Sequence, residues 1–121
     1  MIARVWRGHT KAADADAYTR LLERTGMAEV RATPGNAGAM VLRWVDGGSA
    51  EFVFISFWDD FEAIRRFAGP DVAKAHYYPE DDAFLLGKEP DVRHYEVPLS
   101  AARGADAAER LGSVRFAAEE A

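Results

Sequence analysis

The chain has 121 residues, a net formal charge of −5, 49% hydrophobic residues, 12% aromatic residues and no cysteine. This is the length of one domain and the composition of a folded globular protein. The lack of cysteine excludes disulfides, thiolate metal sites and cysteine nucleophiles. Acidic residues outnumber basic ones. A protein that binds nucleic acid needs clustered positive charge, so we expect no nucleic-acid partner. No apolar run approaches the roughly 20 residues of a membrane span, so we expect a cytoplasmic protein without a membrane partner.

The first quarter of the chain predicts a strand followed by a helix. Residues 2–6 form a short segment rich in β-branched and aromatic residues, which is typical of a strand. Residues 12–25 place Tyr18, Leu21 and Leu22 on one stripe, which is the pattern of an amphipathic helix. Gly26 is expected to end this helix, because glycine accepts the left-handed conformation of a C-cap.

The middle of the chain predicts a hairpin and a second helix. Two apolar runs, residues 39–45 and 50–58, are joined by Asp46-Gly47-Gly48-Ser49, and such glycine pairs reach the backbone angles of a hairpin turn. Residues 60–68 predict a short helix, residues 71–77 one or two further helical turns, and residues 92–97 a last strand. The order β-α-β-β-α-β predicts an α+β, ferredoxin-like fold with an antiparallel sheet.

Both faces of the hairpin strands are apolar. Phe52 and Phe54 alternate with Val53 and Ile55, whereas a half-exposed strand alternates apolar with polar residues. Helices cover only one face of such a sheet, and the bare face would exceed the apolar patch that monomers tolerate. We therefore expect a homodimer formed through the sheet. The alternative is that residues 99–121, a C-terminal extension to a domain of residues 1–98, fold back over this face.

The densest group of reactive side chains is His76, Tyr77 and Tyr78, followed by three carboxylates. An imidazole and phenols exchange protons or donate hydrogen bonds, so this segment is a candidate catalytic cluster. The alternative from the residues alone is an amphipathic segment whose His and Tyr only contact the sheet. The three histidines show no metal-ligand spacing, and no metal site is predicted.

Two arginines share the first strand with apolar neighbours. By alternation Arg4 lies with Trp6 and Arg7 on the opposite face, and a charge among apolar side chains needs a partner or solvent. Either arginine is a candidate to hold an anion in a pocket, or an arginine that reaches water along its stem. Trp6 and Trp58 are candidates to stack on a flat aromatic ligand, or simply core residues.

With these motifs the chain resembles the antibiotic biosynthesis monooxygenase-like family of dimeric α+β barrels. The resemblance covers residues 1–98. It rests on the first strand, on Thr33-Pro34-Gly35-Asn36 before the hairpin, on Phe57-Trp58-Asp59-Asp60 before the second helix, and on the segments ending in His76-Tyr77-Tyr78 and His94-Tyr95-Glu96-Val97.

The resemblance implies three functions. The first is a cofactor-independent monooxygenase for a small aromatic or quinol-like compound, with His76, Tyr77 and Arg7 as catalytic residues and Trp58, Tyr78, Phe67 and Trp6 around the substrate. The second is a non-catalytic homodimer that binds a small hydrophobic molecule. The third is haem binding or degradation through His76. The asparagine and tryptophan of the haem-degrading branch are replaced here by Arg7 and Phe67, so the expected cofactor is none.

Overall fold

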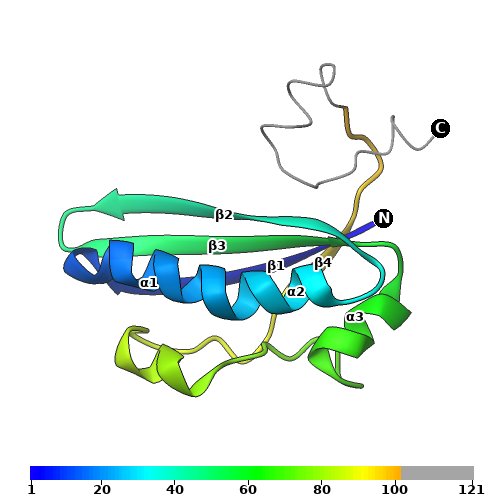
Figure 1. Cartoon of the computed structure of the whole chain (residues 1–121). Coiled ribbons are helices and arrows are strands. Elements are labelled where there is room, and N and C mark those ends of the chain that lie inside the picture. The colour runs from blue at the N-terminus through cyan, green and yellow to red at the C-terminus, as the bar shows by residue number, and fades with distance from the viewer. Residues whose placement is uncertain (102–121) are drawn as a thin grey trace.

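A four-stranded antiparallel sheet forms one layer of the protein in the computed structural model, which describes residues 1–101 (Figure 1). The strand order is β2-β3-β1-β4. The bounds are Ile2–Lys11 for β1, Asn36–Asp46 for β2, Ser49–Trp58 for β3 and Arg93–Glu96 for β4. The first strand is longer than predicted, because Gly8 and Thr10 remain paired with β3 instead of ending the strand. The predicted ferredoxin-like fold is confirmed.

The first helical region runs without interruption from residue 12 to residue 32. A 3-10 turn (Ala12–Asp14) leads into α1 (Ala15–Leu22), a π-helical turn (Glu23–Met27) and α2 (Ala28–Ala32). The prediction that Gly26 caps a helix is therefore wrong. Gly26 is buried inside the helical run, and a Cβ there would lie 3.2 Å from the ring of Phe54. The glycine serves close packing of helix on sheet, and its backbone is not left-handed.

The second helix, α3 (Phe61–Ala68), has the predicted extent. The backbone N–H of Ala63 donates to Asp60 Oδ1 at 2.8 Å, which caps the N-terminus, and Gly69 ends the helix with a φ of 87°. Ile64 is fully buried against the sheet. A helix docked by one apolar stripe follows directly from the sequence.

Residues 71–77 are not helical, contrary to the prediction. Their backbone groups pair with the chain that approaches β4: Ala75 N donates to Pro90 O, and Val92 N donates to Ala73 O. Lys74 forms an isolated bridge with Asp91. These long-range hydrogen bonds replace those of a helix, and one turn of 3-10 helix (Pro79–Ala83) follows.

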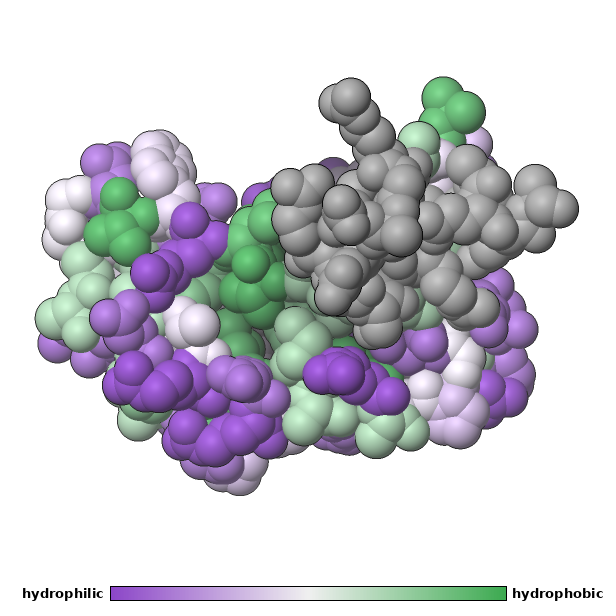
Figure 2. All heavy atoms as spheres, turned by 45° about the horizontal axis from the view of Figure 1, so that its top comes forward, coloured by the Kyte–Doolittle hydropathy of each residue, from purple (hydrophilic) through white to green (hydrophobic). Residues whose placement is uncertain are grey.

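The helices cover one face of the sheet only (Figure 1). Between the layers lies a core that includes Tyr18, Phe52, Trp58 and Ile64. The opposite face, which we call the open face, carries Val5, Leu42, Trp44, Val53, Ile55 and Tyr95. Trp44 is 64% exposed and Leu42 49% exposed. Figure 2 turns this side toward the viewer and shows hydrophobic side chains gathered there. The alternative to the dimer, cover by residues 99–121, falls mainly outside the described residues.

Within residues 1–101, no helix is long and apolar enough to cross a membrane.

Substitution of Gly8 by alanine tests the packing of β1. A Cβ at Gly8 would lie 2.3 Å from the indole of Trp6, so the side chain of Trp6 has to move. We expect Gly8→Ala to lower the free energy of unfolding by about 1–3 kcal/mol, the usual cost of overpacking, measured by urea denaturation. Gly48→Ala is the matched control, because nothing lies within 4 Å of a Cβ built there. Equal effects of the two substitutions would contradict this packing.

Candidate functional site

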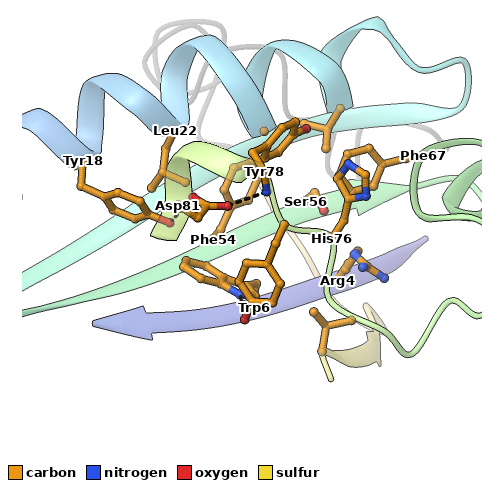
Figure 3. A pocket seen from close by; sticks show the side chains of 14 residues that line it. Arg4, Trp6, Tyr18, Leu22, Phe54, Ser56, Phe67, His76, Tyr78 and Asp81 are labelled. Atoms are coloured by element: carbon orange, nitrogen blue, oxygen red, sulfur yellow. Dashed lines mark hydrogen bonds between the residues drawn. The ribbon is translucent and has the colours of Figure 1, made fainter. Parts of the chain in front are cut away.

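A pocket lies between the helix-covered face of the sheet and the helical layer (Figure 3). Its volume is about 50 Å³. The walls are mostly apolar and aromatic, with a few charged or polar groups among them, which is the usual composition of a small-molecule site. The lining residues are Arg4, Trp6, Tyr18, Leu22, Gly26, Val30, Phe54, Ser56, Phe67, His76, Tyr77, Tyr78, Asp81 and Val92.

Most of the residues predicted for the site line this pocket. Trp6, Phe67, His76, Tyr77 and Tyr78 all do, although they come from three separate parts of the chain. The segment of residues 71–78, which has no helical structure, brings three of them to the pocket.

Trp58 lies behind the pocket wall. Its side chain is fully buried, stacks on Phe67 with ring centroids 5.9 Å apart, and donates a hydrogen bond to Ser56 Oγ at 2.8 Å. Trp58 therefore supports Phe67, and the structure does not place it among the lining residues.

The structure does not bring Arg7 to the pocket. The side chain of Arg7 is on the open face, 60% exposed, with Nη1 4.0 Å from Glu51 Oε1. Arg4, on the other face of the same strand, lines the pocket and is 4% exposed. Alternation along β1 allows only one of the two arginines to face the helices, and the register selects Arg4.

His76 belongs to a polar contact group with Glu29 and Tyr78. His76 Nε2 lies 3.5 Å from Glu29 Oε2, and the Tyr78 hydroxyl donates to the same carboxylate oxygen. The imidazole packs against the rings of Phe67 and Tyr78, each at a centroid distance of 5.0 Å. Burial and the Glu29 carboxylate raise the pKa of Tyr78, so this phenol stays protonated and acts as a donor.

Asp81 is a buried carboxylate at another side of the pocket. Its Oδ1 accepts from the Tyr18 hydroxyl at 3.0 Å, and its Oδ2 accepts from the backbone N–H of Tyr78 at 2.8 Å. Burial, and then the charge of Asp81, raise the pKa of Tyr18. The carboxylate thus fixes both the first helix and the start of the 3-10 turn.

Tyr77 is held by two hydrogen bonds. Its hydroxyl donates to the Glu89 carbonyl at 2.6 Å and accepts from Trp6 Nε1 at 3.1 Å. Burial raises the pKa of Tyr77. The phenol therefore stays neutral and positions the indole that walls the pocket.

No ion pair joins Arg4 to a carboxylate within residues 1–101. Its guanidinium donates to the carbonyls of Val72 at 2.6 Å and Lys74 at 2.8 Å, and it lies 5.8 Å from the centre of the Phe67 ring. Nη1 also lies 3.1 Å from His94 Nε2. Because burial and the charge of Arg4 lower the pKa of His94, its imidazole is neutral at pH 7 and accepts this hydrogen bond.

The sequence patterns did not place Glu29 or Tyr18 at the site, whereas Asp81 is one of the three carboxylates that follow Tyr78 in the predicted cluster. Glu29 was expected to lie beyond the first helix, and only the continuation of the helix through Gly26 brings it to His76. The sequence pattern places Tyr18 on the apolar stripe of the first helix. It gives no sign that the Tyr18 hydroxyl donates to Asp81, 63 residues later in the chain. Their pairing depends on contacts between distant parts of the chain.

The described residues include no group of three or more His, Asp or Glu side chains arranged to hold a metal ion. The side chains at the pocket offer three kinds of chemistry of their own. An imidazole beside a carboxylate transfers protons, neutral phenols donate hydrogen bonds, and a buried guanidinium stabilises negative charge.

Neither a protein-family model nor a curated protein matches the sequence. Solved structures do match. One is the heme-degrader MhuD (Rv3592) from Mycobacterium tuberculosis with two hemes bound in its active site, at a TM-score of 0.56 and 22% identity, covering 84% of this chain and 100% of that chain. Another is an MhuD mutant with two manganese protoporphyrin IX bound per active site, at 0.55 and 20%, covering 85% and 100%.

A third match is Rv0793 from Mycobacterium tuberculosis, with a TM-score of 0.53 and 22% identity over 84% of this chain and 98% of that chain. These similarities establish the fold, which is that of the antibiotic biosynthesis monooxygenase-like proteins, as the sequence resemblance implied.

The pocket in this structure does not fit a haem. Its volume of about 50 Å³ is well below the roughly 300–1,000 Å³ of common small-molecule sites. His76 Nε2, the atom that would bind iron, faces Glu29 at 3.5 Å.

The Tyr18–Asp81 hydrogen bond predicts a pH dependence of stability. The pKa of Tyr18 is raised in the folded state, so its contribution is complete below the unfolded pKa of about 10 and is lost as the pH rises above it. We expect Tyr18→Phe to reduce the free energy of unfolding at pH 7 by about 1–3 kcal/mol, because Asp81 loses a buried donor. Above pH 10, the variant should lose stability less steeply than the wild type in urea denaturation. Parallel stability curves would contradict this assignment.

Proposed function

We propose that the chain is a cofactor-independent monooxygenase for a small phenolic or quinol-like aromatic compound. The observation that carries the proposal is the contact group of His76, Glu29 and Tyr78 on a pocket walled by aromatic rings. An acid–base group beside an apolar wall is what deprotonation of such a substrate requires.

The reaction needs no external reductant. The substrate loses a proton, and the resulting phenolate or enolate gives an electron to dioxygen. The two radicals combine to a peroxide, which breaks its O–O bond and releases water. In sum, a CH₂ group and O₂ become C=O and H₂O, so the substrate supplies all four electrons that dioxygen accepts.

The side chains have separate roles in this proposal. His76 Nε2 accepts the substrate proton, and Glu29, 3.5 Å away, stabilises the imidazolium that forms. Tyr78 keeps its proton because its pKa is raised, so it orients Glu29 by donating a hydrogen bond and does not compete as a base. Tyr77 and Phe67 hold the aromatic walls in place.

A substrate larger than the pocket of about 50 Å³ enters by displacing side chains at its rim. The side chain of His76 is 34% exposed, and Tyr78 is half-buried, so both lie at the surface of the pocket. Movement of these two rings opens the pocket without unfolding the buried core around Tyr18.

The second candidate is a non-catalytic protein that binds a small hydrophobic molecule in the same pocket. The small volume favours it over an enzyme with a permanently open site. Haem binding is a third candidate, because the MhuD structures hold heme or manganese protoporphyrin. It requires the pocket to widen and His76 to turn away from Glu29, since the pocket does not fit a haem as it stands. The test is the absorption spectrum on titration with hemin. A Soret shift in the wild type that is lost in His76→Ala would support haem binding over the other two candidates.

Oxygen uptake tests the catalytic proposal. With a panel of hydroquinones and anthrones, we expect consumption by haem-free protein in the presence of a metal chelator. His76→Ala should reduce the rate at least about 100-fold, because general-base catalysis contributes that much. His9→Ala is the matched control: His9 Nε2 lies 3.6 Å from Glu51 Oε2, but on the open face and outside the pocket. Uptake that is absent, or equal in the two variants, would contradict catalysis through this site.

We also propose that the protein is a homodimer formed through the open face. Leu42 and Trp44 are exposed there, beside the buried Val53 and the partly buried Ile55, and a shallow groove of about 450 Å³ crosses the same residues. Covering apolar area contributes about 25 cal/mol per Å². A second copy of the same sheet supplies a matching apolar surface by two-fold symmetry.

Sedimentation tests this dimer. At micromolar concentration we expect the wild type to sediment with the mass of two chains. Leu42→Glu should weaken association at least tenfold, since it places a charge in the apolar interface. Leu86→Glu, a substitution at a 59% exposed leucine outside the open face, is the control and should leave the dimer intact. A monomeric wild type would contradict the proposal.

A further inference from the structure

Arg4 is a buried cation at the pocket wall. The residue is 4% exposed, and it lines the pocket beside Phe67 and His76. Its guanidinium carries a full positive charge at neutral pH and presents five N–H donors. In the described part of the chain it donates to two carbonyl oxygens, those of Val72 and Lys74.

No carboxylate neutralises this charge among residues 1–101. None of the ion pairs in this part of the chain includes Arg4, and its third polar neighbour is the neutral imidazole of His94. Burial alone lowers the pKa of Arg4 to about 10. Buried charges in proteins are normally paired, so an unpaired one on a pocket wall is unusual.

The two carboxylates near the pocket already have donors. Asp81 accepts from Tyr18 and from the backbone of Tyr78. Glu29 accepts from the Tyr78 hydroxyl and lies beside His76. Neither forms an ion pair with Arg4, so the positive charge at this wall is left for a ligand.

We infer that the pocket takes an aromatic ligand with an anionic group, a carboxylate or a phenolate, and that Arg4 binds this group. The inference rests on the proposed function for the reaction, but the binding is testable without it. Nε does not take part in the three polar contacts of Arg4, which are made by Nη1 and Nη2. A charge-assisted hydrogen bond from Nε or the remaining Nη2 proton would replace the missing counter-charge.

The arrangement of charges also orients the ligand. In Figure 3, Arg4 and Asp81 are on opposite sides of the pocket, with Trp6 and Phe54 between them. The anionic group therefore goes to Arg4 and away from the carboxylate of Asp81. The aromatic ring then lies along the rings of Trp6 and Phe54.

A purely structural role is the competing explanation. The bonds to Val72 O and Lys74 O tie the segment that carries His76 to β1, and an arginine can be kept for that alone. The two explanations differ in one measurable respect. A structural arginine gives no preference between an anionic ligand and a neutral ligand of the same shape.

The test is calorimetric titration of the full chain at pH 7 with 4-hydroxybenzoate and with 4-hydroxybenzamide. The two compounds match in shape, but only the first is an anion. We expect the wild type to bind the benzoate at least tenfold more tightly. Arg4→Met, which keeps much of the stem and removes the charge, should bind both compounds equally. Arg7→Met, on the same strand but facing away from the pocket, is the matched control and should keep the preference.

Equal affinities in the wild type, binding of neither compound at millimolar concentration, or a preference that survives in Arg4→Met would each overturn the inference. If Arg4→Met does not fold, the test rests on the two titrations of the wild type with the benzoate and the benzamide. Arg4→Lys is then the second variant and should keep part of the preference for the benzoate. Failure of the two proposals can be distinguished. A charge preference without oxygen uptake removes only the catalysis, and oxygen uptake without a charge preference removes only the anion site.

Discussion

The pocket depends on one interaction, the contact of the Arg4 guanidinium with the carbonyls of Val72 and Lys74. These hydrogen bonds connect the first strand to a segment that has no regular structure of its own. The sequence predicts a helix for residues 71–77. In the structure this segment is not helical, and its hydrogen bonds with Arg4 fix the path of the chain toward His76. Because the cation is buried, breaking these bonds would leave an unsatisfied charge inside the protein. The position of the candidate base is therefore set by a group 72 residues away in sequence.

A second constraint is the uninterrupted helical run across Gly26. A π-helical turn adds a residue to the helix there, and the missing side chain lets the backbone approach Phe54. Turns of this kind are frequent at functional sites. Here the turn has two consequences, because Gly26 becomes part of the pocket wall and Glu29 comes within reach of His76. Local helix geometry thus assembles a carboxylate–imidazole pair.

The two faces of the sheet carry different chemistry. The helix-covered face holds the buried Arg4 and the aromatic pocket, and the open face holds Arg7, His9 and Glu51 among exposed apolar residues. Successive side chains of β1 point to opposite faces of the sheet, so this one strand supplies Arg4 to the pocket and Arg7 and His9 to the open face. This separation gives two similar pairs different surroundings: His76 with Glu29 lies at a pocket, and His9 with Glu51 lies on an open surface.

The sequence by itself determined the order of the elements, the α3 helix and the hairpin, because these depend on local periodicity, capping and turn residues. It also gave His76, Tyr77, Tyr78, Phe67 and Trp6 as candidates, since reactive and aromatic side chains stand out in composition, and these five residues line the pocket. Only the tertiary structure decided that Arg4 and not Arg7 faces the pocket, that residues 71–77 are not helical, and that Glu29 lies beside His76. Each of these depends on strand register or on hydrogen bonds between distant segments, and local sequence patterns do not encode such pairings.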